Sequence, residues 1–337
     1  MRILVRAANW IGDAVMSLPA LRAIRGRFPD AVIHVLARPW VAALYERERS
    51  IDSLIALEGS PGFRDLREKW GAVSRLRDQR YDAAVLLPNS FESAALVWLA
   101  GITERIGYAR DGRSPLLTIA PTPPKRGEIP THERYYYLEL LHRAEIISSL
   151  PDIPEVRFDG VDEARLRGEQ LLKAQGCAGD VIGVSPGAAY GGAKRWPAER
   201  FAEAAARIAR VREASVAVFG SAAERELCES VAMRAGGVNF AGRTSLRDFA
   251  DMTAACRLFL TNDSGAMHIA SASGVPTATI FGPTDEHATG PAGSKAIILR
   301  KPVACAPCLL RECPIDHRCM TGIAVQDVVH AVQSGTE

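Results

Sequence analysis

The chain has 337 residues, of which 47% are hydrophobic and 24% charged, and its formal net charge is +2. The length suggests two domains, and the composition excludes disorder and coiled coil. A near-zero net charge gives no whole-molecule attraction for nucleic acid, so we expect no such partner. No segment has the roughly 18 apolar residues of a membrane-spanning helix. Seven cysteines, an odd number, do not suggest a secreted disulfide framework, so we expect a cytoplasmic protein.

In the first half of the chain, short apolar runs alternate with helical patterns. Residues 2–6 are typical of a buried parallel strand, and after the loop 7–12 apolar residues recur with helical spacing from Ala14 to Ile24. Further strands are predicted at 31–37, 83–87 and 105–108. This alternation predicts a parallel sheet with helices on both faces.

A stretch around residues 151–155 with two prolines and no periodicity predicts a linker. The strand and helix rhythm then resumes. The predicted strands are 181–185, 215–219, 258–261 and 277–281, and the predicted helices are 198–211, 224–235 and 264–273. We therefore expect an α/β fold of two doubly wound domains that face each other across a cleft. Such sheets bind ligands beyond the carboxyl ends of their strands.

The loop after the first strand contains Asn9, Trp10, Gly12 and Asp13. Gly12 can adopt backbone angles that other residues resist. Asp13 lies at or just before a helix start, where aspartate often caps the free backbone N–H groups. A carboxylate that points into a cleft could instead act as a general base toward an acceptor hydroxyl. The residues alone leave both roles open.

The loop 185–197 follows a strand, precedes a helix and is rich in small residues. Its backbone N–H groups from Ser185 and Gly187 onward could approach a phosphate, with Lys194 as a point charge for a diphosphate. The Walker pattern is absent, and no predicted strand leads into Gly-x-Gly-x-x-Gly. A flexible loop with a solvated lysine is the alternative.

Two further strand ends carry polar residues that could line the same pocket. Asp263, Ser264 and Gly265 open a helix whose N-terminus could meet phosphate, and His268 follows one turn later. Thr284 follows the next strand and could close the pocket. Alternatively, Asp263 or Ser264 only caps the helix, and His268 is an ordinary buried histidine.

Four cysteines near the C-terminus, Cys305, Cys308, Cys313 and Cys319, have the spacing C-x2-C-x4-C-x5-C. Thiolates this close could hold structural zinc or an iron–sulfur cluster. However, structural zinc usually involves two C-x2-C pairs, and this segment has one. Buried thiols or a redox-labile loop are therefore alternatives. In no case do we expect the metal at the reacting bond.

Arginines are frequent in the first half, among them Arg64, Arg67 and Arg113. Such runs are usually solvated helix faces. The arginine fork also suits phosphates, so these three could form a patch for a phosphorylated acceptor.

The motifs taken together resemble the ADP-heptose:lipopolysaccharide heptosyltransferases of glycosyltransferase family 9. The resemblance rests on Asn9–Asp13 with Leu18-Pro19-Ala20-Leu21, Gly187 with Lys194–Pro197, Asn262–Gly265 with His268, and Phe281–Asp285. The cysteine-rich segment is most similar to the heptosyltransferase II branch. The motifs cover nearly the whole chain in the family's order.

The resemblance implies a GT-B fold: an acceptor-binding Rossmann-like domain at 1–155, an ADP-sugar-binding one at 156–324, and a helix within 325–337 that crosses back to the first domain. It also implies inverting transfer of L-glycero-D-manno-heptose from ADP-heptose to the first heptose of the inner core on Kdo2-lipid A. No cofactor is then required. The acceptor is lipid-linked, so the enzyme would work on the inner face of the inner membrane.

In the family, the residue matching Asp13 is the proposed base, and the one matching Lys194 contacts the leaving diphosphate. The residues expected to bind substrates are Asn9, Gly12, Ser185, Gly187, Glu224, Asp263, Ser264, Gly265, His268 and Thr284. Some relatives have paired threonines where Ala189 and Tyr190 stand here, so phosphate contact from that stretch would use the backbone alone.

Two other functions are compatible with the residues. A nucleotide-sugar epimerase of similar build would convert its substrate without an acceptor. A metal- or redox-sensing module built on the four cysteines would use the α/β domains as a nucleotide-binding platform. Neither gives Asp13 a role as readily as group transfer does.

Overall fold

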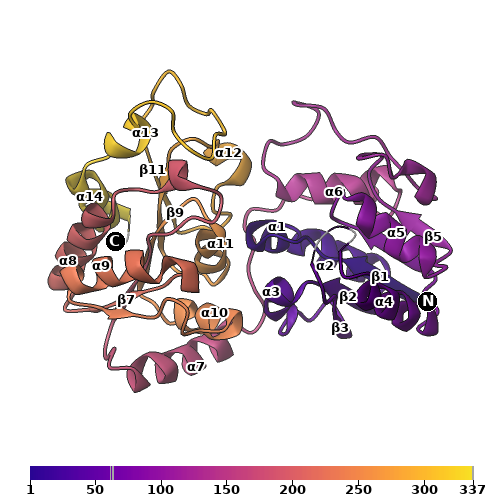
Figure 1. Ribbon diagram of the computed structural model, residues 1–337, viewed down its shortest axis with the longest axis horizontal. Coiled ribbons are helices and arrows are strands. Elements are labelled where there is room, and N and C mark those ends of the chain that lie inside the picture. The colour runs from indigo at the N-terminus through magenta and orange to yellow at the C-terminus, as the bar shows by residue number, and fades with distance from the viewer. Residues whose placement is uncertain (61, 63, 336–337) are drawn as a thin grey trace. The chain divides into compact units, whose positions relative to one another are not determined.

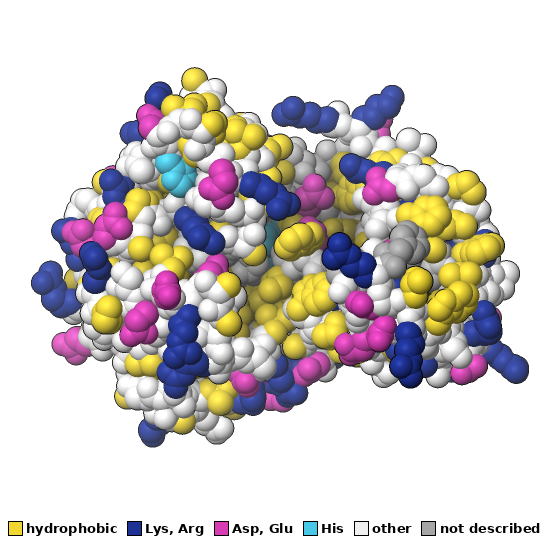
Figure 2. Space-filling view, in the orientation of Figure 1, with side chains coloured by type: hydrophobic (Ala, Val, Ile, Leu, Met, Phe, Trp, Pro, Cys, Tyr) yellow, Lys and Arg dark blue, Asp and Glu magenta, His cyan; other side chains and the backbone are white. Residues whose placement is uncertain are grey.

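The structure is a computed structural model that describes residues 1–60, 62 and 64–335. The chain forms two compact units, which divide between Ile153 and Pro154 (Figure 1). The domain boundary expected at 155 thus lies two residues beyond the observed division. Each unit is an α/β layer structure of its own. Basic and acidic side chains are interspersed over the face in Figure 2, as the small net charge predicts.

Unit 1 contains a five-stranded parallel sheet in the order β3-β2-β1-β4-β5. The strands are β1 (Arg2–Arg6), β2 (Val32–Ala37), β3 (Ser53–Ala56), β4 (Ala83–Leu86) and β5 (Glu104–Ile106). The helices are α1 (Ile11–Met16), α2 (Leu18–Arg27), α3 (Pro39–Ala42), α4 (Leu66–Asp78), α5 (Phe91–Leu99) and α6 (Arg134–Arg143). Helices α4 and α5 cover one face, over a core that includes Leu4, Leu36 and Leu86.

Unit 2 contains a six-stranded parallel sheet in the order β11-β10-β9-β6-β7-β8. The strands are β6 (Val181–Ser185), β7 (Ser215–Val218), β8 (Val238–Asn239), β9 (Leu258–Asn262), β10 (Thr277–Phe281) and β11 (Ala296–Arg300). The helices are α7 (Val161–Ala174), α8 (Ala198–Arg212), α9 (Arg225–Ala235), α10 (Leu246–Ala254), α11 (Gly265–Ala272), α12 (Glu286–Thr289), α13 (Arg318–Thr321) and α14 (Val325–Gly335).

Alternate residues of the unit 2 strands feed two cores on opposite faces, as strand geometry requires. Ile182 and Val184 pack with α8, α9 and α14, whereas Val181 packs with α7 and α10. Because both faces are buried, the central strands are continuously apolar, and this is why the sequence revealed them.

The strands that the sequence analysis missed are β3, β8 and β11. Strands β3, β8 and β11 are all edge strands, and most of their residues are only partly buried or exposed. An edge strand packs less completely, so its apolar pattern is weak.

The expected crossing of the C-terminal helix is corrected by the structure. Helix α14 is part of unit 2, where it packs against α8 and β11, and Val328 and Val332 are fully buried there. The crossing was implied by the resemblance alone, and the apolar side chains of α14 are buried within unit 2. Residues 336–337 lie outside the described residues.

Each sheet has one point where the strand order reverses, between β1 and β4 in unit 1 and between β6 and β9 in unit 2. Ligands of open parallel sheets bind at such switch points, beyond the carboxyl ends of the strands. The loop after β1 contains Asp13, and the loops after β6 and β9 contain Lys194 and Asp263. None of the helices in the described ranges has the length and apolar character needed to cross a membrane.

Candidate active site

Asp13 is the third residue of helix α1, which begins right after the first strand of unit 1. Trp10 occupies the N-cap position, and within the described residues no side-chain hydrogen bond caps this helix. Asp13 therefore does not cap this helix, which was one of the two roles that the sequence left open. Gly12 is the second residue of α1 and is not among the glycines with positive φ, so the unusual backbone that we expected there is absent.

Burial raises the pKa of the Asp13 carboxyl from 3.8 to about 6. The pKa of Glu133, at the start of α6, is also raised, first by its own burial and then by the charge of Asp13. Two carboxyl groups in one poorly solvated region resist ionisation together. A pKa near 6 suits a general base at neutral pH. The sequence analysis did not identify Glu133, because it lies 120 residues from Asp13 in no motif.

Asn9 shapes the loop that leads to Asp13. Its side-chain oxygen accepts a hydrogen bond from Nη2 of the buried Arg6 at 2.6 Å, and its carbonyl accepts one from Nε1 of Trp40 at 2.8 Å. Burial and the neighbouring Arg38 lower the pKa of Arg6 to about 10. The rings of Trp10 and Trp40 are exposed beside this loop.

The three loops predicted to line a pocket in unit 2 do converge. Nζ of Lys194 lies 2.5 Å from Oδ2 of Asp263, and the hydroxyl of Thr284 donates to the same oxygen at 2.6 Å. Lys194 also lies over the ring of Tyr190, 4.7 Å from its centroid. The lysine is thus held at a defined position, and the reading of a solvated lysine on a flexible loop does not hold.

Asn262 fastens the Lys194 loop to β9. Its side-chain nitrogen donates to the carbonyl of Pro186 at 2.8 Å, and its oxygen accepts from the backbone N–H of Trp196 at 3.0 Å. This side chain is fully buried. The sequence motif contained Asn262, but we gave it no role, since the pairing of β6 with β9 is not visible in the sequence.

Gly187 and Glu224 come together at the end of β6. A Cβ on Gly187 would lie 2.0 Å from Oε1 of Glu224, so only glycine allows this approach. The other carboxylate oxygen accepts from the backbone and the hydroxyl of Ser221, at 2.9 and 2.8 Å. Ser185 ends the same strand and is buried.

Helix α11 begins at the predicted loop. Ser264 is its N-cap residue and Gly265 its first residue, and no side chain caps the helix within the described residues. The hydroxyl of Ser264 lies 3.3 Å from that of Thr261. The first N–H groups of this eight-residue helix are therefore available to an anion. His268 is buried one turn further along.

The model of glycosyltransferase family 9 (heptosyltransferase) matches residues 70–318. The chain belongs to this family. It is 32% identical over 313 residues to lipopolysaccharide heptosyltransferase 2 of Escherichia coli K12, which covers 89% of this chain and 88% of the relative. Lipooligosaccharide heptosyltransferase 2 of Haemophilus influenzae is also 32% identical, with the same coverage.

Solved structures agree with this assignment. The E. coli ADP-heptose lipopolysaccharide heptosyltransferase II superposes with a TM-score of 0.82 at 28% identity, over 100% of this chain and 98% of that one. A family 9 glycosyltransferase of Veillonella parvula gives a TM-score of 0.85 at 21% identity and supports the fold. The family 9 protein is thus a GT-B glycosyltransferase, as predicted, and no finding favours an epimerase.

The cysteine-rich segment of this family 9 enzyme lies against the Lys194 loop. Backbone N–H groups of Gly192 and Ala193 donate to Oε1 of Glu312 and the carbonyl of Arg311, each at 2.9 Å. Nε2 of His317 donates to the carbonyl of Ala193 at 2.7 Å. The segment therefore supports the residues next to the lysine. We call residues 309–317 the supporting segment.

The four cysteines all line one small cavity of about 50 Å³, and Cys319 is buried while the other three are exposed. Among the described residues, no group of three or more His, Cys, Asp or Glu side chains is arranged to hold a metal ion. The zinc or iron–sulfur site that the cysteine spacing left open therefore has no such ligand set among the described residues.

The predicted acceptor-phosphate patch does not form as expected, because Arg113 is completely buried. Its guanidinium donates to the carbonyl of Tyr108 at 3.0 Å, the hydroxyl of Ser93 at 3.0 Å and the side chain of Asn89 at 3.2 Å. Burial lowers its pKa to about 10. Arg113 is therefore a structural residue. Arg64 is exposed just before α4, and Arg67 is exposed on that helix.

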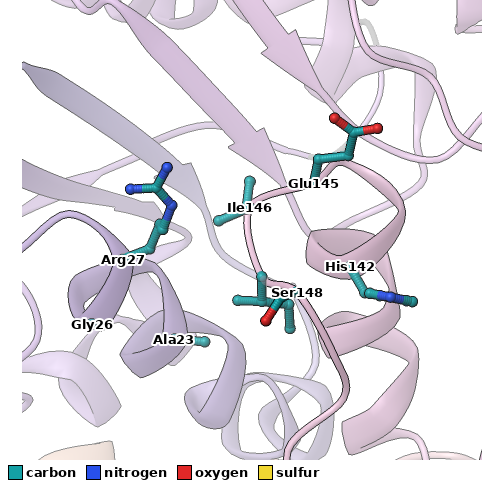
Figure 3. Close-up of a pocket in the computed structure, with 8 residues that line it drawn as sticks. Ala23, Gly26, Arg27, His142, Glu145, Ile146 and Ser148 are labelled. Atoms are coloured by element: carbon teal, nitrogen blue, oxygen red, sulfur yellow. The ribbon is translucent and has the colours of Figure 1, made fainter.

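Unit 1 also has a hollow of about 650 Å³ (Figure 3), and Asp13 is not among the residues that line it. Arg27 at the end of α2 lies on one wall, and His142 and Glu145 at the end of α6 lie on the other. Helix α2 runs back from the carboxyl ends of the strands, so its last turn lies at their amino ends. This is the wrong edge of the sheet for catalysis in this fold.

Proposed function

We propose that the enzyme transfers L-glycero-D-manno-heptose from ADP-heptose to the first heptose of the lipopolysaccharide inner core. Family membership and relatives named heptosyltransferase 2 that align over most of their length support this proposal. The observation that carries it is Asp13, a carboxylate with a pKa raised to about 6 at the switch point of the first sheet.

Asp13 acts as the general base in this proposal. Its carboxylate takes the proton of the acceptor hydroxyl while that oxygen forms a bond to the anomeric carbon of the donor. The bond from that carbon to the diphosphate breaks in the same step, so the configuration inverts and ADP leaves. Because its pKa is about 6, Asp13 is largely ionised at pH 7 yet remains a stronger base than an ordinary aspartate.

Lys194 and the start of α11 receive the charge that develops on ADP. The ammonium group is already placed at the switch point of the second sheet by Asp263 and Tyr190. The N–H groups after Ser264 add partial positive charge at the helix N-terminus. Placed donors and cations of this kind stabilise a leaving diphosphate without rearrangement.

The nucleoside part of the donor is assigned to the end of β6. Glu224 offers carboxylate oxygens to ribose hydroxyls, and Gly187 leaves room for the Glu224 side chain. Ser185, His268 and Thr284 complete the donor side, while Asn9 and Gly12 shape the acceptor side. Arg64 and Arg67 remain the proposed contacts for acceptor phosphates. Because the acceptor is lipid-linked, the enzyme works at the cytoplasmic surface of the inner membrane.

A transfer assay with ADP-heptose and mono-heptosylated Kdo2-lipid A tests the proposal. We expect one ADP released for each heptose added, and no consumption of donor when the acceptor is omitted. Conversion of the donor without acceptor would indicate an epimerase. Release of ADP with an acceptor lacking heptose, but not with the mono-heptosylated one, would assign a different step.

A further inference from the structure

Four large hydrophobic side chains are exposed on two adjacent helices of unit 1. Leu66 and Trp70 on α4 are 57% and 54% exposed, and Phe91 and Trp98 on α5 are 41% and 50% exposed. Their spacings of four and seven residues place each pair on one side of its helix. Hydrophobic side chains gather over this part of the molecule in Figure 2. We call these four residues the α4–α5 face.

A cavity of about 90 Å³ opens between the two helices. Carbon atoms of Leu66, Trp70 and Val73 line one side, and Ala95, Leu96 and Leu99 line the other. The charges at its floor are neutralised, since Nζ of Lys69 lies 3.0 Å from Oε1 of Glu92. The space is therefore suited to a hydrocarbon group and not to a charged ligand.

The segment that carries α4 is basic. Residues 64–80 contain six Lys or Arg against three Asp or Glu, and the five arginines among them are exposed. Nη2 of Arg77 donates to the carbonyl of Leu99 at 2.8 Å, so one guanidinium lies at the rim of the cavity. Exposed tryptophans with arginines at their edge are the side chains that prefer the interface of a bilayer with anionic lipids.

We propose that the α4–α5 face docks on an anionic lipid bilayer. Trp70, Trp98 and Phe91 enter the boundary between headgroups and acyl chains, and the arginines of α4 contact the anionic headgroups. This inference rests on the proposed function, because a lipid-linked acceptor is presented at such a surface. A second copy of the chain fits less well, since a two-fold contact through this face would bring the same arginines together.

Flotation of the full chain with vesicles tests the proposal. We expect binding to vesicles of equal parts phosphatidylcholine and phosphatidylglycerol, weaker binding in high salt, and little binding to phosphatidylcholine alone. The double variant Trp70→Ser, Trp98→Ser should lose at least tenfold in the bound fraction. The matched control Leu166→Ser, Met233→Ser removes two exposed hydrophobic side chains from α7 and α9 and should bind like the parent.

Two results would overturn the proposal: equal vesicle binding by the tryptophan variant and the parent, or loss of a dimer in the variant with vesicle binding unchanged. Circular dichroism establishes that each variant is folded. Transfer to an acceptor without acyl chains separates the two proposals. If the parent fails that reaction but binds vesicles through this face, the proposed function fails and the docking surface stands. If it transfers heptose but ignores the vesicles, the reverse holds.

Discussion

The ammonium group of Lys194 and the carboxylate of Asp263 meet at 2.5 Å, across the boundary between strands β6 and β9. The two residues are 69 positions apart, and their loops leave neighbouring strands at the point where the strand order reverses. Thr284, from a third loop, donates to the same carboxylate oxygen. The cation is therefore in place before any diphosphate arrives, and a bound diphosphate would share it with Asp263.

Lys194→Ala is expected to lower kcat/KM by about 10²- to 10³-fold, because it removes the cation that we propose for the leaving diphosphate. It also leaves the buried Asp263 unpaired, so the free energy of unfolding should fall by about 3 kcal/mol. Lys194→Ala with Asp263→Asn should recover much of the stability but none of the activity. Steady-state kinetics and denaturant unfolding measure both. Full activity in Lys194→Ala would assign the lysine to structure alone.

Asp13→Asn should reduce kcat by about 10²- to 10⁴-fold while ADP binds normally, since a positioned base contributes that much. In the parent enzyme only the ionised carboxylate accepts a proton. Because burial raises the pKa of Asp13 in the free enzyme to about 6, kcat/KM should rise with pH up to about 6 and then level off. A pH series of kcat/KM checks this. A value of kcat/KM that stays constant between pH 5 and 7 would contradict the assignment.

Glu312→Ala should weaken the contact between the supporting segment and the Lys194 loop. It should therefore raise KM for the donor several-fold and leave KM for the acceptor unchanged. The reason is that Oε1 of Glu312 accepts the backbone N–H of Gly192, two residues before Lys194. Glu312→Gln keeps an oxygen at that place and should restore the parent value. Ile315→Ser, which changes another exposed side chain of the same segment, is the matched control. Equal effects of the Ala and Gln variants would show that the charge, not the hydrogen bond, matters.

Gly187→Ala should lower affinity for ADP by about tenfold, a loss of about 1.4 kcal/mol. The added Cβ would collide with Oε1 of Glu224 and push this side chain out of its present position. Gly26→Ala is a suitable control, because nothing lies within 4 Å of the added atom there. Calorimetric titration with ADP measures the difference. Unchanged affinity in Gly187→Ala would remove Glu224 from the nucleoside site.

Heptose transfer should continue in the presence of EDTA, because the proposed mechanism assigns the charge of the leaving diphosphate to Lys194 and the N–H groups of α11 and needs no metal there. Metal analysis of the purified protein examines the four cysteines separately. A loss of transfer in EDTA that added Mg²⁺ or Mn²⁺ restores would show that a divalent cation contributes to the reaction.

The sequence by itself determined the parallel α/β fold, the central strands and the loops that carry Asp13, Lys194, Asp263 and Thr284. This was possible because strands buried on both faces are continuously apolar, and polar residues at their carboxyl ends are conspicuous. The partly exposed edge strands β3, β8 and β11 gave no such pattern, whereas the edge strand β5 was predicted at 105–108.

Only the tertiary structure decided which side chains meet. It paired Lys194 with Asp263, brought Glu133 near Asp13, buried Arg113 among carbonyl groups and kept α14 within unit 2. A charged side chain in a sequence has the same identity whether it faces water or the interior. Its burial and partners depend on strand order and helix packing, which are set by contacts between residues far apart in the chain.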